Sequence, residues 1–407
     1  MLVLEGKYTE ARVFADIVDD VTKGQVQTLI DQPFMENIKV RIMADCHAGA
    51  GCVIGTTLKV KDKIVPNLVG VDVGCGMLCI KLGKIDIDFK ILDNFIRLNI
   101  PSGQNVNDKI TITDVDIEDL RCYKELKNHQ YLKRSLGSLG GGNHFIEIDV
   151  NSDGQYYLII HSGSRNLGKQ MAEYYQNKAI EYHENKLMNK EEAIRKIINE
   201  YKQTGREKEI DNKIKLINSI KVDLSFPKEL AFLEGKDFED YIFDMNICQK
   251  YASENRLEMA KRILTLFKLN IEEVEKFETI HNYINMEDMI LRKGSVSAYK
   301  DQLLLIPINM RDGCIIAMGK SNPEYNYSAP HGAGRIMSRT EAIRKIKLED
   351  FKDAMTGVFS TTINAATIDE SPFVYKPIES ILKNIEETVE IKEIIKPVYN
   401  FKASEWF

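Results

Sequence analysis

Strand-like and helix-like segments are separated along this chain, and that separation is the strongest constraint on its fold. Short apolar stretches broken by glycine fill the first hundred or so residues, among them KVRIMADC, GCVIGTTLKV and NLVGVDVGCGMLCIKL. A second strand-rich patch holds FIEIDV and QYYLIIHSG, and strand-like text returns at QLLLIPINM and CIIAMG. Helices inserted as a block between strand-rich segments favour an α+β fold over regular alternation of strands and helices.

The helical block begins near residue 170. From there to about residue 220 the sequence is highly charged, and its apolar residues recur at helical spacing, which predicts an amphipathic helix. The recurring positions are Ala193, Ile194, Ile197, Ile198 and Tyr201. Two more helices are expected, in FEDYIFDMNICQKYASENRLEMAKRIL and in IEEVEKFETIHNYINMEDM. With no internal repeat and no Pro/Ser-rich linker, we expect one domain over residues 1–407, with a helical insertion at approximately 170–290.

The composition, 43% hydrophobic and 29% charged, is that of a globular protein, and no run approaches the ~20 apolar residues that cross a bilayer. The N-terminal text lacks the features of a signal peptide, so a cytoplasmic protein is expected. A formal net charge of -6 argues against non-specific binding of polyanions, but it is compatible with one local cationic site. Seven cysteines in such a chain indicate buried thiols or metal ligands rather than a disulfide framework.

Four of the seven histidines stand within two residues of a glycine. They are His47 in ADCHAGAG, His144 in GSLGGGNHF, His161 in IIHSGSRNLG and His331 in SAPHGAGR. Glycine beside a polar group at a strand end permits a tight turn and close approach of a ligand. One such histidine would more often be structural, but four in one chain indicate a site.

Asp72 and Cys75 are three residues apart, across a glycine-containing turn that follows the expected strand NLVGV. A carboxylate and a thiolate so placed could both point at one metal. Imidazole and carboxylate suit Mn, Fe or Zn, whereas a thiolate shifts the preference towards Zn. The spacing predicts one or two metals held by Asp72, Cys75 and some of His144, His161 and His281, the last expected on a helix. Hydrolysis and phosphoryl transfer both remain open for such a centre.

Cations flank the same loops: Arg165, Lys293, Arg335 and Arg339. Guanidinium groups match phosphate oxygens bidentately, so these residues suit a phosphate-bearing substrate. The sequence has no Walker A motif, but backbone N–H groups of GSLGGGNHF could cradle phosphates.

Taken in order, the motifs MADCHAGAGCVIGT, VGVDVGCGM, GSLGGGNHFIEI, HSGSRNLG, SAPHGAGRIMSR and DESPFVYKP resemble those of the RtcB family of RNA-splicing ligases over almost the whole chain. The resemblance implies an α+β fold of β-sheets packed with helices around a cleft that holds two Mn²⁺ ions. The implied ligands are Asp72, Cys75, His144, His161 and His281, with the Cys75 thiolate bridging both metals.

The resemblance also implies GTP chemistry. His331 would attack the α-phosphate of GTP and carry GMP as a phosphoramidate, while Asp45 orients its ring. Asn143 and Glu147 would contact the nucleotide, and Glu147 would select guanine by accepting hydrogen bonds from its N1–H and exocyclic amine.

Further contacts follow from the same likeness. Tyr375 and Lys402 would complete the base contacts. Arg165, Lys293 and Arg339 would hold RNA phosphate.

The implied reaction joins an RNA 3′-phosphate or 2′,3′-cyclic phosphate to a 5′-hydroxyl in three nucleotidyl-transfer steps. A monomer is expected, with archease as a candidate activating partner. Two motifs depart from the family pattern: DCHAGAG has Ala50 in place of a lysine, and PINMRDG has Asn309 in place of a serine that contacts the nucleotide. These changes suggest a divergent subgroup devoted to RNA repair.

Two other functions are compatible with these residues. A dinuclear metal phosphodiesterase would use the same cluster with His331 as one more ligand and no covalent intermediate. A non-catalytic RNA-binding protein would carry a degenerate site, which the full set of motif residues disfavours.

Overall fold

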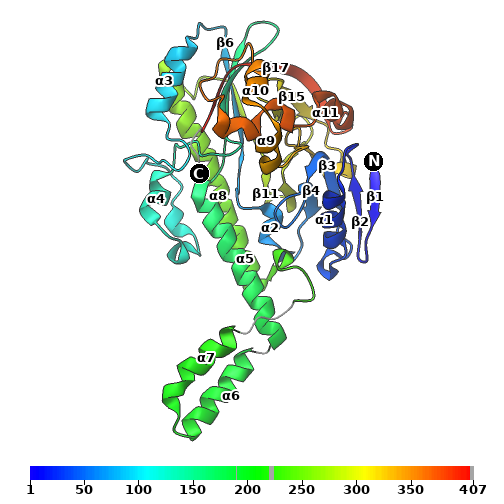
Figure 1. Ribbon diagram of the computed structural model, residues 1–407, viewed down its shortest axis with the longest axis vertical. Helices are drawn as coiled ribbons and strands as arrows, with labels where there is room; N and C mark the ends of the chain where they lie inside the picture. The colour runs from blue at the N-terminus through cyan, green and yellow to red at the C-terminus, as the bar shows by residue number, and fades with distance from the viewer. Residues whose placement is uncertain (189, 220–223, 404–407) are drawn as a thin grey trace.

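The computed structural model describes residues 1–188, 190–219 and 224–403. Within these ranges the strands form two large sheets, a six-stranded one in which only one pair of neighbouring strands is parallel and a seven-stranded antiparallel one, and helices pack around them, as expected for an α+β protein (Figure 1). The six-stranded sheet runs in the order β1 (Leu2–Glu5), β2 (Glu10–Val13), β3 (Val40–His47), β4 (Ile54–Lys59), β12 (Ile290–Lys293) and β11 (Asn282–Ile284). The seven-stranded sheet runs in the order β10 (Lys276–Ile280), β6 (Gly76–Gly83), β8 (Tyr156–Ser162), β7 (Phe145–Val150), β17 (Val389–Lys402), β15 (Gly313–Gly319) and β14 (Leu303–Asn309).

Two short pairs complete the strands. They are β13 (Ser295–Ser297) with β16 (Ser328–Pro330), and β5 (Lys63–Ile64) with β9 (Leu233–Glu234). The α-helices in the described ranges are α1 (Asp20–Ile30), α2 (Pro66–Val69), α3 (Phe89–Asn99), α4 (His129–Arg134), α5 (Arg165–Met188), α6 (Lys190–Gln203), α7 (Ile210–Ser219), α8 (Gly235–Leu266), α9 (Arg339–Lys345), α10 (Leu348–Ala354) and α11 (Ile378–Ile385).

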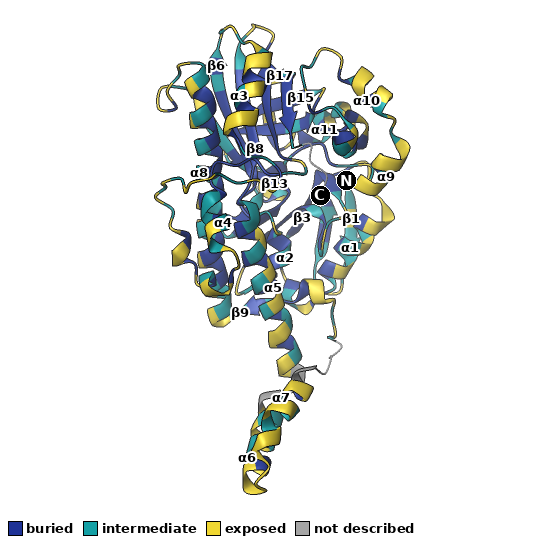
Figure 2. Ribbon diagram, turned by 60° about the vertical axis from the view of Figure 1, so that its left-hand side comes forward, coloured by how far each residue is buried: buried dark blue, intermediate teal, exposed yellow. Residues whose placement is uncertain are grey.

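Strand alternation divides the seven-stranded sheet into a core face and a site face, because successive side chains of a strand point to opposite sides. On the core face, Ile146 and Ile148 of β7 and Ile160 of β8 pack with Met259 and Ile263 of α8. The intervening residues of the same strands, including Phe145, Glu147 and His161, therefore lie on the opposite face. Buried strands and outward-facing exposed helix surfaces are evident in Figure 2.

The charged middle segment is helical, as its spacing predicts. Helix α6 contains the apolar positions 193–201 and packs against α7, with Tyr201 buried. The two helices project from the end of α5, away from the sheets (Figure 1). The long helix α8 confirms the second predicted helix, and it packs along α5. Among the described residues, no helix combines the length and apolar character that a bilayer crossing requires.

Two sequence-based expectations are wrong. The segment IEEVEKFETIHNYINMEDM is not a helix: it forms β10 and β11, and His281 stands between them. β10 pairs antiparallel with β6, so the sheet satisfies the backbone hydrogen bonds that a helix would otherwise make internally. NLVGV is not a strand either, because Pro66 begins the short helix α2 just before the Asp72–Cys75 turn.

Candidate metal and nucleophile site

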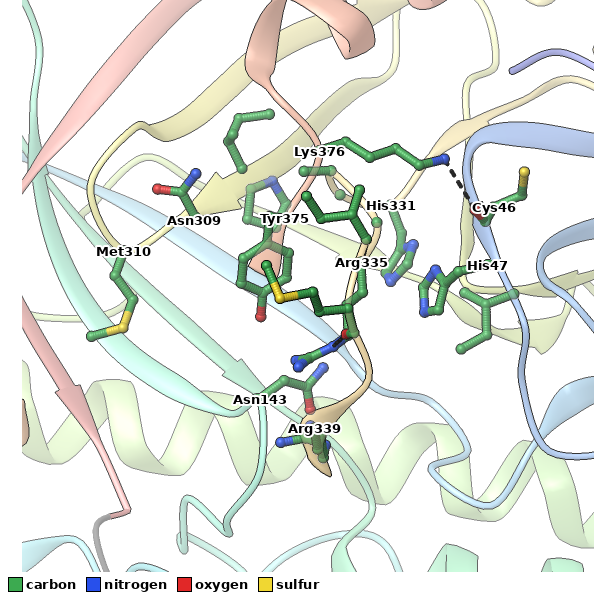
Figure 3. Close-up of a pocket in the computed structure, with 18 of the residues that line it drawn as sticks. Cys46, His47, Asn143, Asn309, Met310, His331, Arg335, Arg339, Tyr375 and Lys376 are labelled. Carbon is green, nitrogen blue, oxygen red and sulfur yellow. Dashed lines mark hydrogen bonds between the residues drawn. The ribbon is translucent and has the colours of Figure 1, made fainter. Parts of the chain in front are cut away.

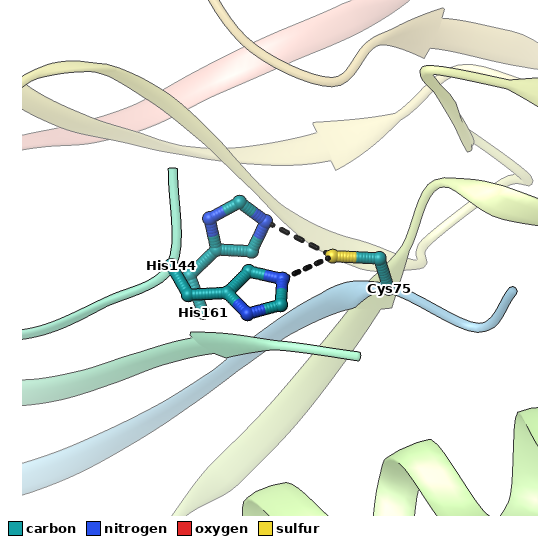
Figure 4. A group of neighbouring side chains, drawn as sticks. All are labelled: Cys75, His144 and His161. Carbon is teal, nitrogen blue, oxygen red and sulfur yellow. Dashed lines mark hydrogen bonds between the residues drawn. The ribbon is translucent and has the colours of Figure 1, made fainter. Parts of the chain in front are cut away.

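Three predicted ligands meet at the end of the seven-stranded sheet. The Sγ atom of Cys75 lies 3.4 Å from Nε2 of His144 and 3.3 Å from Nε2 of His161, and all three side chains are buried (Figure 4). Cys75 directly precedes β6, and His161 lies near the end of the neighbouring strand β8, opposite Met77. The antiparallel pairing of β6 and β8 therefore brings the thiol and the imidazole together.

Asp72 and His281 extend this group at its two ends. The Asp72 Oδ2 atom lies 2.9 Å from Nε2 of His144, and Nε2 of His161 lies 3.4 Å from Nε2 of His281. The five side chains form a continuous series with the Cys75 thiol in the middle. We call these five residues the ligand cluster.

Backbone carbonyls fix the tautomers of two of the histidines. Nδ1 of His144 lies 2.9 Å from the carbonyl oxygen of Leu139, and Nδ1 of His161 lies 3.2 Å from that of Asn143. Since a carbonyl oxygen only accepts, each Nδ1 carries the proton and each Nε2 presents a lone pair to the cluster. Such outer hydrogen bonds are typical of metal-bound histidines.

The electrostatics of the cluster fit a bound cation. Burial lowers the pKa of His161 and His281 well below the ordinary value, which keeps both rings neutral. Burial opposes ionisation of Asp72, yet neighbouring His144 brings the pKa of that carboxyl down to about 2. Burial and the Asp72 charge raise the pKa of the Cys75 thiol well above its ordinary value, so a thiolate there needs a positive partner.

Two polar residues of α8 that the sequence did not single out hold the loops of the cluster. The Asn255 amide accepts from the backbone N–H groups of residues 137 and 138 and donates to the carbonyl oxygens of residues 138 and 163. The Arg256 guanidinium donates to the Gly74 carbonyl oxygen at 2.8 Å and to that of Ser162 at 2.6 Å. Both residues are fully buried. In the sequence these two residues could be recognised as adjacent polar residues among the apolar residues of a long predicted helix.

His331 stands beside the cluster and is held by Asp45. The Asp45 Oδ2 atom lies 2.6 Å from Nδ1 of His331, and the backbone N–H groups of His331 and Gly332 donate to the same oxygen at 3.0 and 3.1 Å. Asp45 is fully buried at the end of β3. The rings of His331 and His281 are 4.8 Å apart between centroids. Three hydrogen bonds to one carboxylate oxygen therefore fix the His331 ring next to the cluster.

His161, His281 and His331 line a cavity of about 770 Å³ (Figure 3). Pockets of this size accommodate small-molecule ligands such as a nucleotide. Its lining includes the following residues that the sequence singled out: His47, Asn143, Glu147, His161, His281, Asn309, His331, Arg335, Arg339, Tyr375 and Lys402.

Comparison with known families identifies the family of this chain. The sequence model described as "tRNA-splicing ligase RtcB" matches residues 25–129 and 116–403. The chain belongs to the RtcB family. It is 28% identical to the RNA-splicing ligase RtcB of Escherichia coli K12, over 89% of this chain and 90% of that protein. It is 25% identical to the tRNA-splicing ligase RtcB of Methanococcus maripaludis, over 92% of this chain and 89% of that protein.

Membership of the RtcB family confirms the resemblance seen in the motifs, and the expected nucleotide contacts lie around one buried carboxylate. The Tyr375 hydroxyl donates to Glu370 Oε2 at 2.7 Å, and Lys402 Nζ lies 3.3 Å from the same oxygen and 3.2 Å from the Asn143 carbonyl oxygen. Burial opposes ionisation of Glu370, but Lys402 and Arg339 bring its pKa down to about 2. Glu370 thus holds these groups at the cavity wall, a role that the sequence did not reveal.

Glu147 lies deeper in this RtcB-family cavity. Its Oε2 atom accepts from the Asn400 amide, and burial raises the pKa of the carboxyl to about 7. Asp149, two residues along the same strand face, is also fully buried, and burial together with Glu147 raises its pKa well above the ordinary value. Two adjacent carboxyls so placed cannot both be ionised at low cost.

The three basic residues expected at RNA phosphate have different settings. Arg339 lines the cavity, half-exposed, and its guanidinium pairs with Asp369 and with Glu370. The Arg165 guanidinium instead donates to the Gly103 carbonyl oxygen at 2.9 Å. The buried Lys293 donates to the carbonyl oxygens of residues 50 and 67 at 2.8 and 2.7 Å. The structure brings Arg339 to the cavity wall and leaves Arg165 and Lys293 tied to backbone outside its lining.

The structure also shows the contacts of Asn309 and Ala50, the two positions that depart from the family motifs. Asn309 caps the turn between β14 and β15, because its Oδ1 accepts from the backbone N–H groups of Arg311 and Asp312 and its amide donates to the Asp312 carboxylate. The Ala50 carbonyl oxygen accepts from Lys293. Lys293 therefore fixes the loop in which Ala50 replaces the family's lysine.

Proposed function

We propose that this RtcB-family chain is a GTP-dependent RNA ligase in which His331 carries GMP. The observation that supports it is the placement of His331: Asp45 holds its Nδ1, and the ring lies beside the ligand cluster at the wall of the cavity. With Nδ1 bonded to a carboxylate, Nε2 is left as the nucleophilic lone pair. The substrates are RNA ends, one a 3′-phosphate or 2′,3′-cyclic phosphate and the other a 5′-hydroxyl.

The ligand cluster, made of Asp72, Cys75, His144, His161 and His281, would hold two divalent cations. One carboxylate, one thiolate and three imidazoles, with neutral histidines and a buried thiol lacking a positive partner, fit such a pair. When bound, the cations supply Lewis-acid neutralisation of the phosphate under attack. Manganese is the metal that the family resemblance implies, whereas the thiolate by itself favours zinc.

The reaction is three transfers at phosphorus. The His331 Nε2 lone pair forms a bond to the α-phosphorus of GTP as the bond to pyrophosphate breaks. An oxygen of the RNA 3′-phosphate then attacks that phosphorus and releases the imidazole. The 5′-hydroxyl of the second RNA attacks the activated 3′-phosphate, loses its proton and expels GMP. A cyclic phosphate end is first hydrolysed to the 3′-phosphate.

Glu147 would select guanine. It lies in the cavity lining, and as a carboxylate it accepts from the two neighbouring donors of the guanine edge, N1–H and the exocyclic amine. Adenine lacks both donors at those positions. Asn143, Tyr375 and Lys402 would complete the nucleotide contacts, and Arg339 is the cation at the cavity that we assign to RNA phosphate.

We further propose a cytoplasmic protein with a single ligase domain over residues 1–407 and a helical insertion. The family resemblance adds a monomeric state, archease as an activating partner, and Arg165 and Lys293 as contacts to RNA phosphate.

The direct test is ligation. Purified protein loaded with Mn²⁺ receives GTP and two RNA strands, one ending in a 3′-phosphate and one beginning with a 5′-hydroxyl. We expect a joined strand with GTP and none with ATP. With a strand that ends in a 2′,3′-cyclic phosphate, opening of the cyclic phosphate without a joined product, whichever nucleotide is present, would instead support the metal phosphodiesterase.

A further inference from the structure

Asp45 orients two imidazoles, not one. Its side-chain oxygen holds Nδ1 of His331, and its backbone carbonyl oxygen lies 2.9 Å from Nδ1 of His47. Both rings line the cavity, and they lie next to each other in Figure 3. The family motif that supplies Asp45 therefore also places a second histidine beside the proposed nucleophile.

The hydrogen bond to the Asp45 carbonyl fixes the His47 tautomer. A carbonyl oxygen has no proton to give, so Nδ1 of His47 must donate and Nε2 keeps its lone pair. No residue in the described ranges hydrogen-bonds to that Nε2. Burial lowers the pKa of His47, which keeps the ring neutral at physiological pH. His47 thus presents a free proton acceptor to the cavity.

Several other acceptors and cations at the cavity wall already have partners within the protein. The Glu147 carboxylate accepts from Asn400, while Arg335 and Arg339 pair with Glu370. The Asp19 carboxylate caps the first turn of α1 by accepting from Thr22. Nδ1 of His331 is occupied by Asp45, and its Nε2 is the proposed site of GMP transfer.

The joining step needs a base, because an alcohol is a weak nucleophile until its proton is removed. We propose that His47 is the general base of this step, a role that rests on the proposed ligase function. Nε2 of His47 accepts the proton of the RNA 5′-hydroxyl as the 5′ oxygen bonds to the 3′-phosphate phosphorus. The bond from that phosphorus to the bridging oxygen of GMP breaks, GMP leaves, and the imidazolium returns its proton to water.

The test separates joining from guanylylation. His47→Asn keeps an amide N–H near the position of Nδ1, which can still donate to the Asp45 carbonyl, but it lacks the distal acceptor. Mn²⁺-loaded wild type and variant are given GTP alone, and separately a synthetic RNA whose 3′-phosphate already carries GMP, together with a 5′-hydroxyl RNA. We expect guanylylation of His331 within about twofold of wild type and joining slowed by about 10²- to 10⁴-fold, the usual contribution of a general base.

The pH profile gives a second readout. The wild-type joining rate is expected to rise with pH and then level off once His47 is neutral, whereas the variant rate keeps rising with hydroxide concentration. His47→Gln repeats the measurement if the first variant is unstable. His129→Asn, a histidine outside the cavity lining, is the matched control and should behave as wild type.

The possible results distinguish a general base at His47 from a purely structural histidine. Joining of the synthetic RNA at the wild-type rate by His47→Asn would overturn the proposal. An equal loss in guanylylation and joining would also overturn it, because His47 would then act only by holding Asp45. Failure of wild type to form the guanylylated protein, with normal joining of the synthetic RNA, would count against the His331 chemistry and leave the His47 comparison measurable.

Discussion

At the scale of single residues, the site depends on one buried carboxylate oxygen. Oδ2 of Asp45 takes hydrogen bonds from the His331 ring and from two backbone N–H groups, while Oδ1 has no partner among the described residues. The carboxylate therefore sets both the tautomer of His331 and the path of the backbone that carries it. A neutral amide cannot accept all three bonds at one position as strongly.

Asp45→Asn should slow guanylylation of His331 by up to about 10⁴-fold, the loss seen when a carboxylate that orients a catalytic imidazole becomes an amide. Bound metal should be unchanged, because within the described part of the chain Asp45 makes no hydrogen bond to a member of the ligand cluster. Rates come from single-turnover labelling with α-labelled GTP, and metal content from mass spectrometry. Loss of metal together with activity would refute the assignment of Asp45 to the nucleophile alone.

Much of the site was predictable from residue types and their neighbours. Asp72, Cys75 and some of His144, His161 and His281 were predicted to form a metal cluster, and the structure brings all five side chains together. Spacing alone could not reveal the order of contacts or the place of Cys75 at the centre, because these depend on how β6 and β8 pair. Glu370 stands in the quoted motif DESPFVYKP but escaped prediction, because a single glutamate at the end of a short 3₁₀ helix, residues 365–370, carries no spacing pattern.

At the scale of elements, helix α8 fixes the loops next to the ligand cluster through side-chain hydrogen bonds to their backbone. Asn255 holds residues 137, 138 and 163, and Arg256 holds residues 74 and 162. These residues flank Cys75, His144 and His161 in the sequence. The sequence predicted α8 correctly from its periodicity, but not this function, since a periodic pattern shows which face is buried and not what its polar members bind.

Asn255→Ala should weaken metal binding by about 10- to 100-fold, the usual cost of losing an outer support of a metal site. The backbone groups that it leaves unpaired should also lower thermal stability. Metal affinity is measured by titration of the chelator-treated protein. Asn246→Ala, on the same helix but half-buried and away from these loops, serves as the control. Equal affinity in both variants would show that α8 does not support the cluster.

Strand β7 carries two buried carboxyls on one face, Glu147 and Asp149. The pKa of Glu147 is raised to about 7 and that of Asp149 well above its ordinary value, so the folded protein keeps protons that the unfolded chain has released. Their contribution to stability is fully present below about pH 4 and is lost as pH rises through about 7. Both positions face the buried Cys314 thiol.

Asp149→Asn should therefore reduce the loss of stability between pH 5 and pH 8. The amide can still donate to Glu147, and it has no proton to release. Melting temperatures of wild type and variant are compared across this range in the presence of a chelator, so that metal binding does not contribute. The exposed Asp153→Asn is the control. Parallel curves for Asp149→Asn and wild type would contradict the buried-acid account.

Strand and helix assignments failed where tertiary pairing outweighed local pattern. The segment that holds His281 has charged and apolar residues that fit a helix, but its pairing with β6 at the sheet edge makes it a strand. Residues 66–69 are apolar like a strand, but the proline at the start of α2 fits a helix N-terminus. Periodicity predicts neither element. Strand β10 depends on pairing with a strand distant in sequence, and helix α2 depends on a single proline.

At the scale of the whole molecule, the ligand cluster combines residues at the ends of strands with residues in the loops to which α8 hydrogen-bonds. Asp72 and Cys75 precede β6, His161 lies next to the last residue of β8, and His281 links β10 of one sheet to β11 of the other. A metal that binds all of them binds the folded chain and not the unfolded one. Metal binding is therefore coupled to the stability of the entire fold.

Adding Mn²⁺ to chelator-treated protein should raise its melting temperature by a few degrees at a concentration about 100 times the dissociation constant, where binding contributes about 2.7 kcal/mol. Cys75→Ala should abolish most of this shift along with ligation, because the thiol lies at the centre of the ligand cluster, 3.4 Å from His144 Nε2 and 3.3 Å from His161 Nε2. Differential scanning fluorimetry measures both. An undiminished shift in Cys75→Ala would place the metal elsewhere.

The central claim is that His331 forms a covalent bond to GMP. Mn²⁺-loaded protein is incubated with α-labelled GTP and denatured, and the labelled peptide is identified by mass spectrometry. The account predicts one label on His331, stable to alkali, lost in acid and absent from His331→Ala that retains its metal. No label on protein shown to hold its metals, or loss of the metals in His331→Ala, would contradict it and make His331 a metal ligand of a phosphodiesterase.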